Sequence, residues 1–250
     1  MKNKAEGEAR WALGMMSGTS MDGVDAALLR SDGARIAEFG PSHFRAYDDA
    51  ERAALQEALS RAASAPVPSG AEDPRFAAAR AVVLTAHRQA AERLMAMDGA
   101  PRPSLVGFHG QTVLHRPEQA LTIQIGDGAA LAAALGAPVV FDFRSADVAA
   151  GGQGAPFAPF YHAALARHAR EAGRAPEGPI AFLNLGGVAN ATWVEAGAED
   201  PAAPGALLAF DTGPANAMVD DWMTARAGAR FDADGATALA GRADEALVAA

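Results

Sequence analysis

The chain alternates between short apolar runs and glycine-rich turns, a pattern that predicts β-strands joined by tight loops. Longer stretches with leucine and alanine at three- and four-residue spacing predict helices between the strands. We expect strands within residues 10–16, 23–40, 104–110, 121–125, 139–143, 179–194 and 206–214. We expect helices within residues 48–64, 75–97, 128–135, 157–173 and 215–228.

Residues 121–143 follow the order strand, glycine turn, helix, strand. That order is typical of a βαβ unit, so we predict that its two strands lie parallel to each other. The glycine-rich segment after it, residues 144–156, predicts a long irregular loop. Together these elements predict an α/β fold class.

The pattern of strand, glycine turn and strand that opens the chain near Trp11 returns near Ile180. Residues 174–179 (RAPEGP) stand before the second copy and predict a linker. The repeat is one of pattern, without strong sequence identity, and predicts two domains that begin alike. We expect a flexible N-terminus over residues 1–10, a first domain over 11–173 and the start of a second domain over 178–250.

Half of the 250 residues are apolar and a fifth are charged, so the chain can bury a core. A net charge of −9 argues against a nucleic-acid or anionic-membrane partner. The absence of cysteine excludes disulfides, thiolate metal sites and cysteine nucleophiles. The charged start of the chain and the short apolar run after it predict neither a signal peptide nor a membrane span, and we expect a soluble, cytoplasmic protein.

Two glycine turns carry the first candidate chemistry. The turn at residues 17–23 combines glycines with serine and threonine hydroxyls, and the turn at residues 186–187 is a glycine pair. Such loops expose backbone N–H groups and hydroxyls that can hold phosphate oxygens. Asp22 and Asp25 would repel a phosphate unless a cation such as Mg²⁺ lies between them. For either loop alone, an ordinary hairpin turn is the alternative.

Several other motifs fit poorly. A P-loop needs a lysine after its glycines, but both lysines, Lys2 and Lys4, precede every glycine turn. A G-x-S-x-G hydrolase elbow fails at Asp22, which takes the place of the last glycine. The histidines form no H-E-x-x-H pattern, which argues against a zinc site of that kind.

The strongest rival is a dinucleotide-binding fingerprint at residues 126–132 (GDGAALA). It lies between a predicted strand and helix, and Asp142 provides an acid at the end of the next strand. However, Leu131 takes the third glycine position, and Asp127 stands where a pyrophosphate would approach. This reading predicts NAD binding.

Polar residues also follow predicted strands, where α/β proteins place ligands. Asp142, Arg144 and Asp147 follow one strand, and a carboxylate there can serve as a general base. Helix capping or a salt bridge to Arg144 is the alternative for either acid.

Two further strand ends repeat this layout. His109, Gln111 and Thr112 can hydrogen-bond a polyhydroxylated ligand. The alternative for His109 is a loop residue whose hydrogen bonds are all made within the protein. Asp211 is an acid at a third strand end.

Six segments together resemble the bacterial anhydro-N-acetylmuramic acid kinase family. They occur in that family's order and cover nearly the whole chain from Leu13 on. The segments are GMMSGTSMDGVDAALL, GFHGQTVLHRP, TIQIGDGAALA, DFRSADVAAGGQGAPFAP, AFLNLGGVANATW and FDTGPANAMVDDW. The resemblance implies the two-domain, actin-like (ribonuclease H-like) fold of the sugar kinase, Hsp70 and actin superfamily, in which each domain opens with a glycine-turn hairpin.

The resemblance implies a reaction that uses ATP and Mg²⁺. Water attacks C1 of 1,6-anhydro-N-acetylmuramic acid, the anhydro bridge opens, and O6 receives the γ-phosphate, which gives N-acetylmuramic acid 6-phosphate for peptidoglycan recycling. Asp147 matches the family's catalytic base, and Asp22 is the expected Mg²⁺-side residue. The protein would mainly position groups and stabilise charge.

The remaining site residues follow from the same resemblance. The nucleotide-side residues are Gly18, Thr19, Ser20, Met21, Asp22, Gly23, Val24, Asp25, Gly186, Gly187, Asn190, Asp211 and Gly213. The sugar-side residues are His109, Gly110, Gln111, Thr112, Gly126, Asp127, Gly128 and Arg144.

Known family members continue beyond residue 250, so we expect an incomplete second domain that leaves apolar surface exposed, with weak ATP binding and little kinase activity. The expected partners are the amino sugar and ATP, with a homodimer as a further expectation. The alternatives are another amino-sugar kinase of the superfamily and a non-catalytic sugar- or nucleotide-binding remnant.

Overall fold

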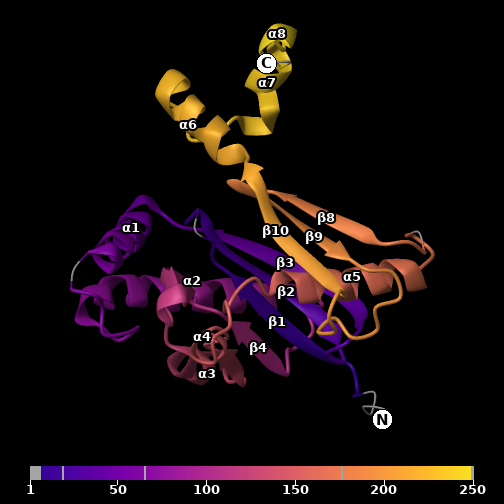
Figure 1. Ribbon diagram of the computed structural model, residues 1–250. Helices are drawn as coiled ribbons and strands as arrows, with labels where there is room; N and C mark the ends of the chain where they lie inside the picture. Colours follow the sequence, from indigo (N-terminus) through magenta and orange to yellow (C-terminus); the bar gives the residue numbers. More distant parts are fainter. Residues whose placement is uncertain (1–6, 19, 65, 176, 249–250) are drawn as a thin grey trace. The chain divides into compact units, whose positions relative to one another are not determined.

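The computed structural model describes residues 7–18, 20–64, 66–175 and 177–248. The expectation for the first six residues and the nucleotide-side assignment of Thr19 therefore lie outside the described residues. The fold is mixed α/β, and it divides after Phe157 into two compact units that are described separately below (Figure 1). The division into a first and a second functional domain stays a prediction.

A five-stranded mixed sheet forms the centre of the first unit, in the order β3-β2-β1-β4-β7. Its first three strands are antiparallel neighbours, whereas β4 runs parallel to both β1 and β7. The sequence predicted all five strands, although β3 continues to Ala46, beyond the expected end at residue 40. Alternation of buried and exposed positions explains β1 and β2 best. The bounds are β1 Arg10–Met16, β2 Gly23–Ser31, β3 Ile36–Ala46, β4 Leu105–Phe108 and β7 Val139–Phe141.

Two helices complete the core: α2 packs against the sheet, and α1 packs against α2. Helix α1 (Asp49–Ala63) begins at a capping box, in which Asp48 accepts from the Glu51 N–H and Glu51 accepts from the Asp48 N–H. Helix α2 (Ala77–Met95) follows the short 3₁₀ turn η1 (Pro74–Phe76) and contacts α1, β2 and β3. Its buried residues face the sheet at helical spacing: Ala79, Val83, Ala86, His87, Ala90, Ala91 and Leu94.

A separate two-stranded hairpin corrects the expected βαβ unit. Strand β6 (Leu121–Ile125) pairs antiparallel with β5 (Gln111–Arg116), which was not predicted, and not with β7. Helix α3 (Gly128–Leu135) does connect β6 to β7, but the parallel partner of β7 is β4. The prediction was wrong because the chain between β4 and β6 folds back as a hairpin, with the turn η2 (Pro117–Gln119) at its tip.

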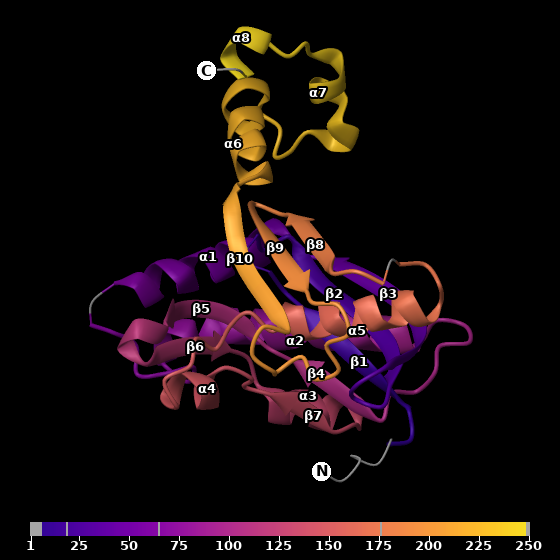
Figure 2. The ribbon, with the colours of Figure 1, turned by 45° about the vertical axis from the view of Figure 1, so that its right-hand side comes forward.

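The predicted irregular loop also contains a short helix, α4 (Ser145–Ala149). Helix α4 contacts β6, so this part of the loop lies against the hairpin (Figure 2). The rest of the loop, residues 150–157, has no regular structure.

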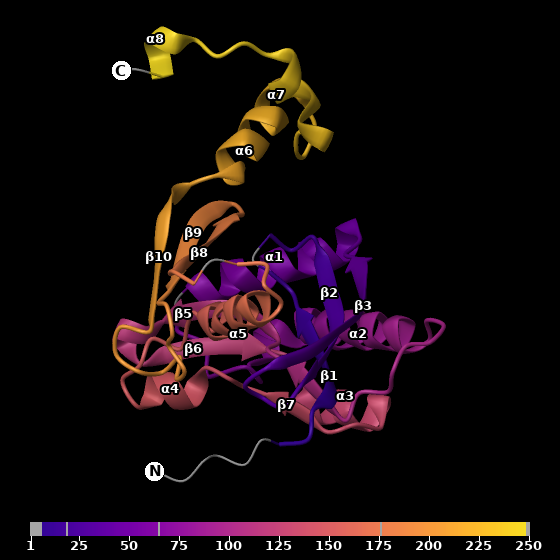
Figure 3. The same ribbon diagram turned by 90° about the vertical axis from the view of Figure 1, so that its right-hand side faces the viewer.

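The second unit consists of a three-stranded antiparallel sheet, β10-β9-β8, with helix α5 (Ala158–Glu171) against β9 and β10. Because α5 packs on these strands, it groups with them and not with the residues before it, and the division lies ahead of residues 174–179. Helix α6 (Asn216–Ala227) follows β10 (Figure 3). The remaining bounds are β8 Ile180–Leu185, β9 Val188–Val194, β10 Leu207–Pro214, η3 Ala233–Gly235, α7 Ala236–Ala240 and α8 Glu245–Val248.

The two faces of this sheet differ. On one face, Phe182 stacks on His162 of α5, with ring centroids 4.7 Å apart, and Val194 is buried. The register aligns Leu183 with Phe210 across Ala191, and Trp193 with Leu208, so these side chains share the other face. All four are exposed, between 42% and 62%. We call Leu183, Trp193, Leu208 and Phe210 the apolar face.

None of the helices in the described parts of the chain has the length and hydrophobicity needed to cross a membrane.

Candidate active site

The candidate site begins where two parallel strands end. Met15 of β1 and Phe108 of β4 are aligned, so residues 17–22 and residues 109–110 leave the sheet at the same edge. In open α/β sheets this edge, beyond the carboxyl ends of parallel strands, is where ligands bind. We call residues 17, 18 and 20–22 the first loop; Thr19 lies outside the described residues.

The side chain of Asp22 organises the end of the first loop. Its Oδ1 accepts from the Ser20 hydroxyl at 2.9 Å and from the Gly23 N–H at 3.1 Å. Met21 takes a positive φ of 51° and donates its N–H to the Gly18 carbonyl. The loop is therefore a tight turn, in agreement with the hairpin alternative, and it still exposes Ser20 and Asp22 to solvent.

Strand β2 leaves this loop through Gly23 and Val24, which are both buried. A Cβ on Gly23 would lie 2.4 Å from the Arg45 carbonyl oxygen, so only glycine fits beside β3 at this point. Val24 is fully buried and serves the core.

Asp25 lies on the exposed side of β2. Partial burial and then the nearby charge of Asp22 raise the pKa of Asp25 above its usual value.

The acids Asp22 and Asp25 suit a cation that is shared with a ligand. Across the described ranges, no group of three or more histidine or acidic side chains could hold a metal by itself. Mg²⁺ commonly needs only one or two carboxylates when phosphate oxygens and water complete its shell. Asp22 Oδ2 is the carboxylate oxygen that neither Ser20 nor Gly23 uses, so the residues present fit such an ion.

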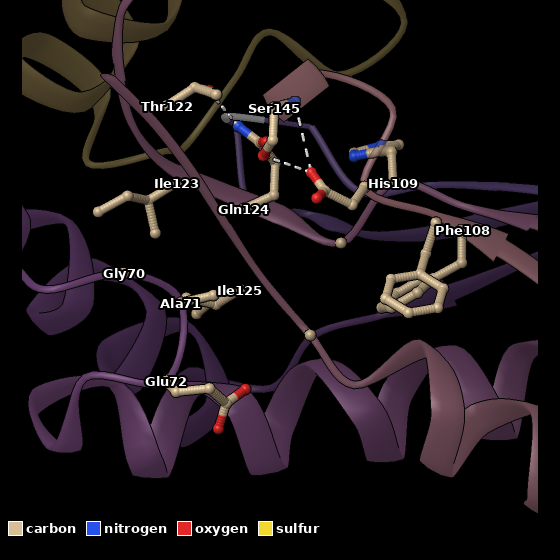
Figure 4. A pocket seen from close by; sticks show the side chains of 14 residues that line it. Gly70, Ala71, Glu72, Phe108, His109, Thr122, Ile123, Gln124, Ile125 and Ser145 are labelled. Atoms are coloured by element: carbon tan, nitrogen blue, oxygen red, sulfur yellow. Dashed lines mark hydrogen bonds between the residues drawn. The ribbon is translucent and has the colours of Figure 1, made fainter. Parts of the chain in front are cut away.

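A cavity of about 340 Å³ lies next to the β4 end (Figure 4). Its lining comes from the turn before η1, from the ends of β4, β6 and β7, and from α4. Both polar groups and rings take part, as in a site for a small ligand with hydroxyl and apolar parts. The lining residues are Gly70, Ala71, Glu72, Phe108, His109, Gly110, Thr122, Ile123, Gln124, Ile125, Gly126, Phe141, Asp142 and Ser145.

Two glycines bring the chain segments at this cavity into direct contact. Gly110 (φ 69°) and Gly126 (φ 146°) both adopt conformations that favour glycine. A Cβ on Gly110 would lie 2.6 Å from the Ile125 carbonyl oxygen, and one on Gly126 would lie 2.5 Å from the Phe108 ring. Gly110 and Gly126 were predicted to lie on the sugar side. The close packing of their two segments by itself requires glycine at both positions.

His109 is the lining residue with the most perturbed environment. Its Nε2 accepts from the Ser17 N–H at 3.4 Å, and its buried Nδ1 has no partner among the described residues. Burial, followed by the positive charge of Arg144, lowers the pKa of His109. Because Nε2 accepts a hydrogen bond, the neutral form of the ring carries its proton on Nδ1.

The other sugar-side candidates divide between the cavity and its surroundings. Gln111 is buried against the first loop, and Thr112 is half-buried opposite Gln124 in the hairpin. Asp127 caps α3 by accepting from the Ala130 N–H at 2.8 Å, and Gly128 is buried. These four residues are not part of the cavity lining, whereas His109, Gly110 and Gly126 are.

Asp147 in α4 and Arg144 just before it both bind the backbone of Gly154. The Gly154 N–H donates to Asp147 Oδ2, and Arg144 Nη1 donates to the Gly154 carbonyl, each at 2.7 Å. Gly152 lies so close that a Cβ would meet the Asp147 carboxylate at 2.2 Å. The glycines of this loop therefore allow the backbone to approach Asp147. No donor among the described residues binds the other carboxylate oxygen of Asp147, Oδ1.

Arg144 and Asp142 have further structural partners. The Arg144 guanidinium lies 5.6 Å from the centroid of the Phe157 ring, and burial lowers its pKa. Asp142 adopts φ 56° and accepts from the hydroxyl of Ser145, the first residue of α4.

The second glycine hairpin, in the second unit, is tied to the start of α6. The carbonyls of Gly186 and Gly187 accept from the Asn216 and Ala215 N–H groups at 2.9 and 3.0 Å. Asn190 pairs with Asp211 in the register, immediately before a bulge. Gly213 in that bulge has φ 140°.

Comparison with known proteins identifies the family. The model of the family described as anhydro-N-acetylmuramic acid kinase matches residues 10–250. This chain belongs to the anhydro-N-acetylmuramic acid kinase family.

Relatives from several bacteria agree with this assignment. The chain is similar to the anhydro-N-acetylmuramic acid kinase of Cereibacter sphaeroides, with 55% identity over 98% of this chain and 61% of the relative. It is 50% identical to the kinases of Rhodospirillum rubrum and Methylobacterium nodulans, over 97% and 95% of this chain and 59% and 63% of those relatives. The chain spans about three fifths of the length of these curated relatives.

Several residues of the candidate site were not predicted from the sequence. Ser17 and Tyr47 contact the first loop, and Gln124 and Ser145 line the cavity. Ser17 is the first residue of the predicted turn but was not among the predicted site residues, and its hydroxyl was the available signal. Tyr47 lies at the far end of β3, where only the folded sheet brings it to the loop.

Proposed function

We propose that this chain acts in the ATP-dependent conversion of 1,6-anhydro-N-acetylmuramic acid to N-acetylmuramic acid 6-phosphate. Asp147 carries the proposal: the backbone holds one carboxylate oxygen and leaves the other for a water molecule. Membership of the kinase family supports the choice of reaction. A two-domain actin-like architecture, a cytoplasmic location and a homodimer belong to the same proposal.

In the proposed mechanism, Asp147 takes a proton from water as the water oxygen bonds to C1 of the sugar. The bond between C1 and O6 breaks, and O6 bonds to the γ-phosphorus of ATP, which releases ADP. A positioned general base of this kind contributes about 10²- to 10⁴-fold to a rate. Mg²⁺, held on the side of Asp22, would neutralise phosphate charge.

The other residues position the reactants in this proposal. The first loop and the turn at Gly186 and Gly187 offer backbone N–H groups to phosphate oxygens. His109 offers its Nδ1 proton to the sugar, and Arg144 offers a cation to a carboxylate or phosphate. Asn190, Asp211 and Gly213 belong to the nucleotide side.

The decisive experiment is the substitution Asp147→Asn. An asparagine oxygen can still accept from the Gly154 N–H, so the loop keeps its anchor while the base is lost. We expect kcat with anhydro-sugar and ATP·Mg²⁺ to fall about 100-fold or more, with little change in the KM for the sugar. The matched control is Asp32→Asn, in the turn between β2 and β3, where an amide oxygen can replace the carboxylate that accepts from the Ala34 N–H.

Two outcomes would contradict the proposal. Equal turnover of Asp147→Asn and the parent would remove Asp147 from catalysis. Faster phosphorylation of ordinary N-acetylmuramic acid than of the anhydro-sugar would assign a different amino-sugar kinase reaction.

A further inference from the structure

A buried hydrogen-bond network joins the first loop to the turn after β4. Ser17, Tyr47 and Gln111 are each 2% exposed or less, and they come from three separate parts of the first unit. Ser17 follows β1, Tyr47 follows β3, and Gln111 begins β5. Buried polar side chains are kept only where they are satisfied, so their arrangement here is specific.

The directions of these bonds follow from one fixed acceptor. The Gly18 carbonyl can only accept, so Gln111 must present its Nε2 to it, at 3.3 Å. Gln111 Oε1 then faces Ser17 and accepts from the Ser17 hydroxyl. Because that hydroxyl has one proton, it must accept from the Tyr47 hydroxyl, at 3.0 Å.

Backbone contacts extend the network to both ends of the first loop. The Ser17 N–H donates to His109 Nε2, and the Tyr47 N–H donates to the Asp22 carbonyl at 2.9 Å. The loop is therefore fixed at its start by Ser17 and Gly18 and at its end by Asp22. His109 also lines the cavity, so the same turn contacts the loop and the cavity.

We propose that Ser17, Tyr47 and Gln111 are positioning residues that hold the first loop in the conformation that binds the phosphates of ATP. This inference rests on the proposed function. It changes the role of Gln111, which sequence reasoning placed against the sugar: both ends of its amide are occupied by the loop. The residues act through the loop backbone and do not contact the ligand.

The test compares Ser17→Ala and Gln111→Met with the parent. Each variant removes the Ser17–Gln111 bond while keeping approximate size, and Ser17→Thr, which keeps the hydroxyl, is the conservative rescue. The matched control is Ser104→Ala, because Ser104 lies at the opposite end of the same pair of strands and donates to the Trp11 carbonyl. Calorimetry measures the Kd for ATP·Mg²⁺, and hydrogen exchange follows peptides that cover residues 17–23 and helix α2.

We expect Ser17→Ala and Gln111→Met each to weaken ATP·Mg²⁺ binding about five- to tenfold, as loss of one or two buried hydrogen bonds would. The double variant should be no weaker than about the worse single variant, since both substitutions break the same network. Exchange over residues 17–23 should rise while exchange in α2 stays at the parental rate. Ser17→Thr and Ser104→Ala should match the parent in binding.

The possible failures are distinguishable. Parental affinity in both Ser17→Ala and Gln111→Met would overturn the network and leave the proposed function standing. Equally faster exchange in α2 would reveal general destabilisation and would also overturn the positioning role. A parent that fails to bind ATP·Mg²⁺ would overturn the proposed function and this inference with it.

Discussion

His87 gives this fold a sensitivity to acid that can be worked out from its surroundings. The side chain lies inside α2 with no solvent exposure, and its Nδ1 donates to the Val83 carbonyl at 2.7 Å. Because a carbonyl only accepts, the ring proton is on Nδ1, and the buried Nε2 has no partner in the described part of the chain. The edge of the ring meets Phe108, with centroids 4.9 Å apart. A second proton on Nε2 would place a charge among apolar groups.

Burial, as the largest cause, lowers the pKa of His87 from 6.5 to about 4. The unfolded chain therefore binds this proton more readily than the folded chain. The stability that results is fully present above pH 6.5 and is lost as the pH falls from 6.5 towards 4. The full shift corresponds to roughly 3 kcal/mol, and most of it should be lost between pH 7.5 and pH 4.5.

The perturbation that isolates this effect is His87→Leu, which removes the titrating group and retains an apolar side chain. Urea unfolding at a series of pH values gives the free energy of unfolding for the parent and the variant. Other titrating groups affect both proteins alike, so the difference between the two curves reports His87. We expect the parent to lose roughly 2 to 3 kcal/mol more than the variant between pH 7.5 and pH 4.5.

A non-titrating substitution on the same helix, Thr85→Val, provides the control, because Thr85 is exposed and its replacement leaves the parental pH dependence in place. Parallel curves for the parent and His87→Leu would refute the reasoning. Such a result would mean that the His87 ring is protonated, or hydrated, within the folded state.

Three further predictions concern the backbone, a helix end and the second unit. Gly126→Ala should destabilise the protein by about 1–3 kcal/mol, because φ is 146° and the new Cβ would meet the Phe108 ring. An unchanged midpoint of urea unfolding would contradict this. Asp48→Ala should cost about 1 kcal/mol by removing the capping box of α1, as measured by urea unfolding, whereas Asp48→Asn should retain most of that stability. Replacing Leu183 and Phe210 of the apolar face by serine should reduce self-association in size-exclusion chromatography; identical profiles would show that this face plays no part in it.

Much of the element order could be predicted because it depends on local patterns. The β1–β2 hairpin, the capped helix α1 and the strand that ends at Phe108 each follow from short-range spacing and turn residues. The partner of β6 could not be predicted in the same way. Which strands become neighbours depends on contacts between distant segments, and the intervening β5 carries a buried glutamine, Gln111, that is typical of a loop when viewed alone.

The candidate site divides along the same line. Asp147 was a candidate because it follows a predicted strand, and the resemblance implied its role as base. The structure adds a reason for the glycines near it, which is close backbone approach to a carboxylate. The roles of Ser17 and Gln111 depend on a contact between residues 94 positions apart. Such a contact leaves no periodic signal in one sequence, so only the folded chain shows it.

The crossing of Gly110 and Gly126 has a consequence for inhibitor design. Both residues line the cavity, and a Cβ on Gly126 would lie 3.4 Å from the Gly110 Cα, so this part of the wall is backbone alone. A compound that fits closely against it would meet a surface that resistance substitutions cannot reshape without disturbing the fold. Selectivity between related proteins would instead have to come from lining side chains, such as Glu72 and Thr122.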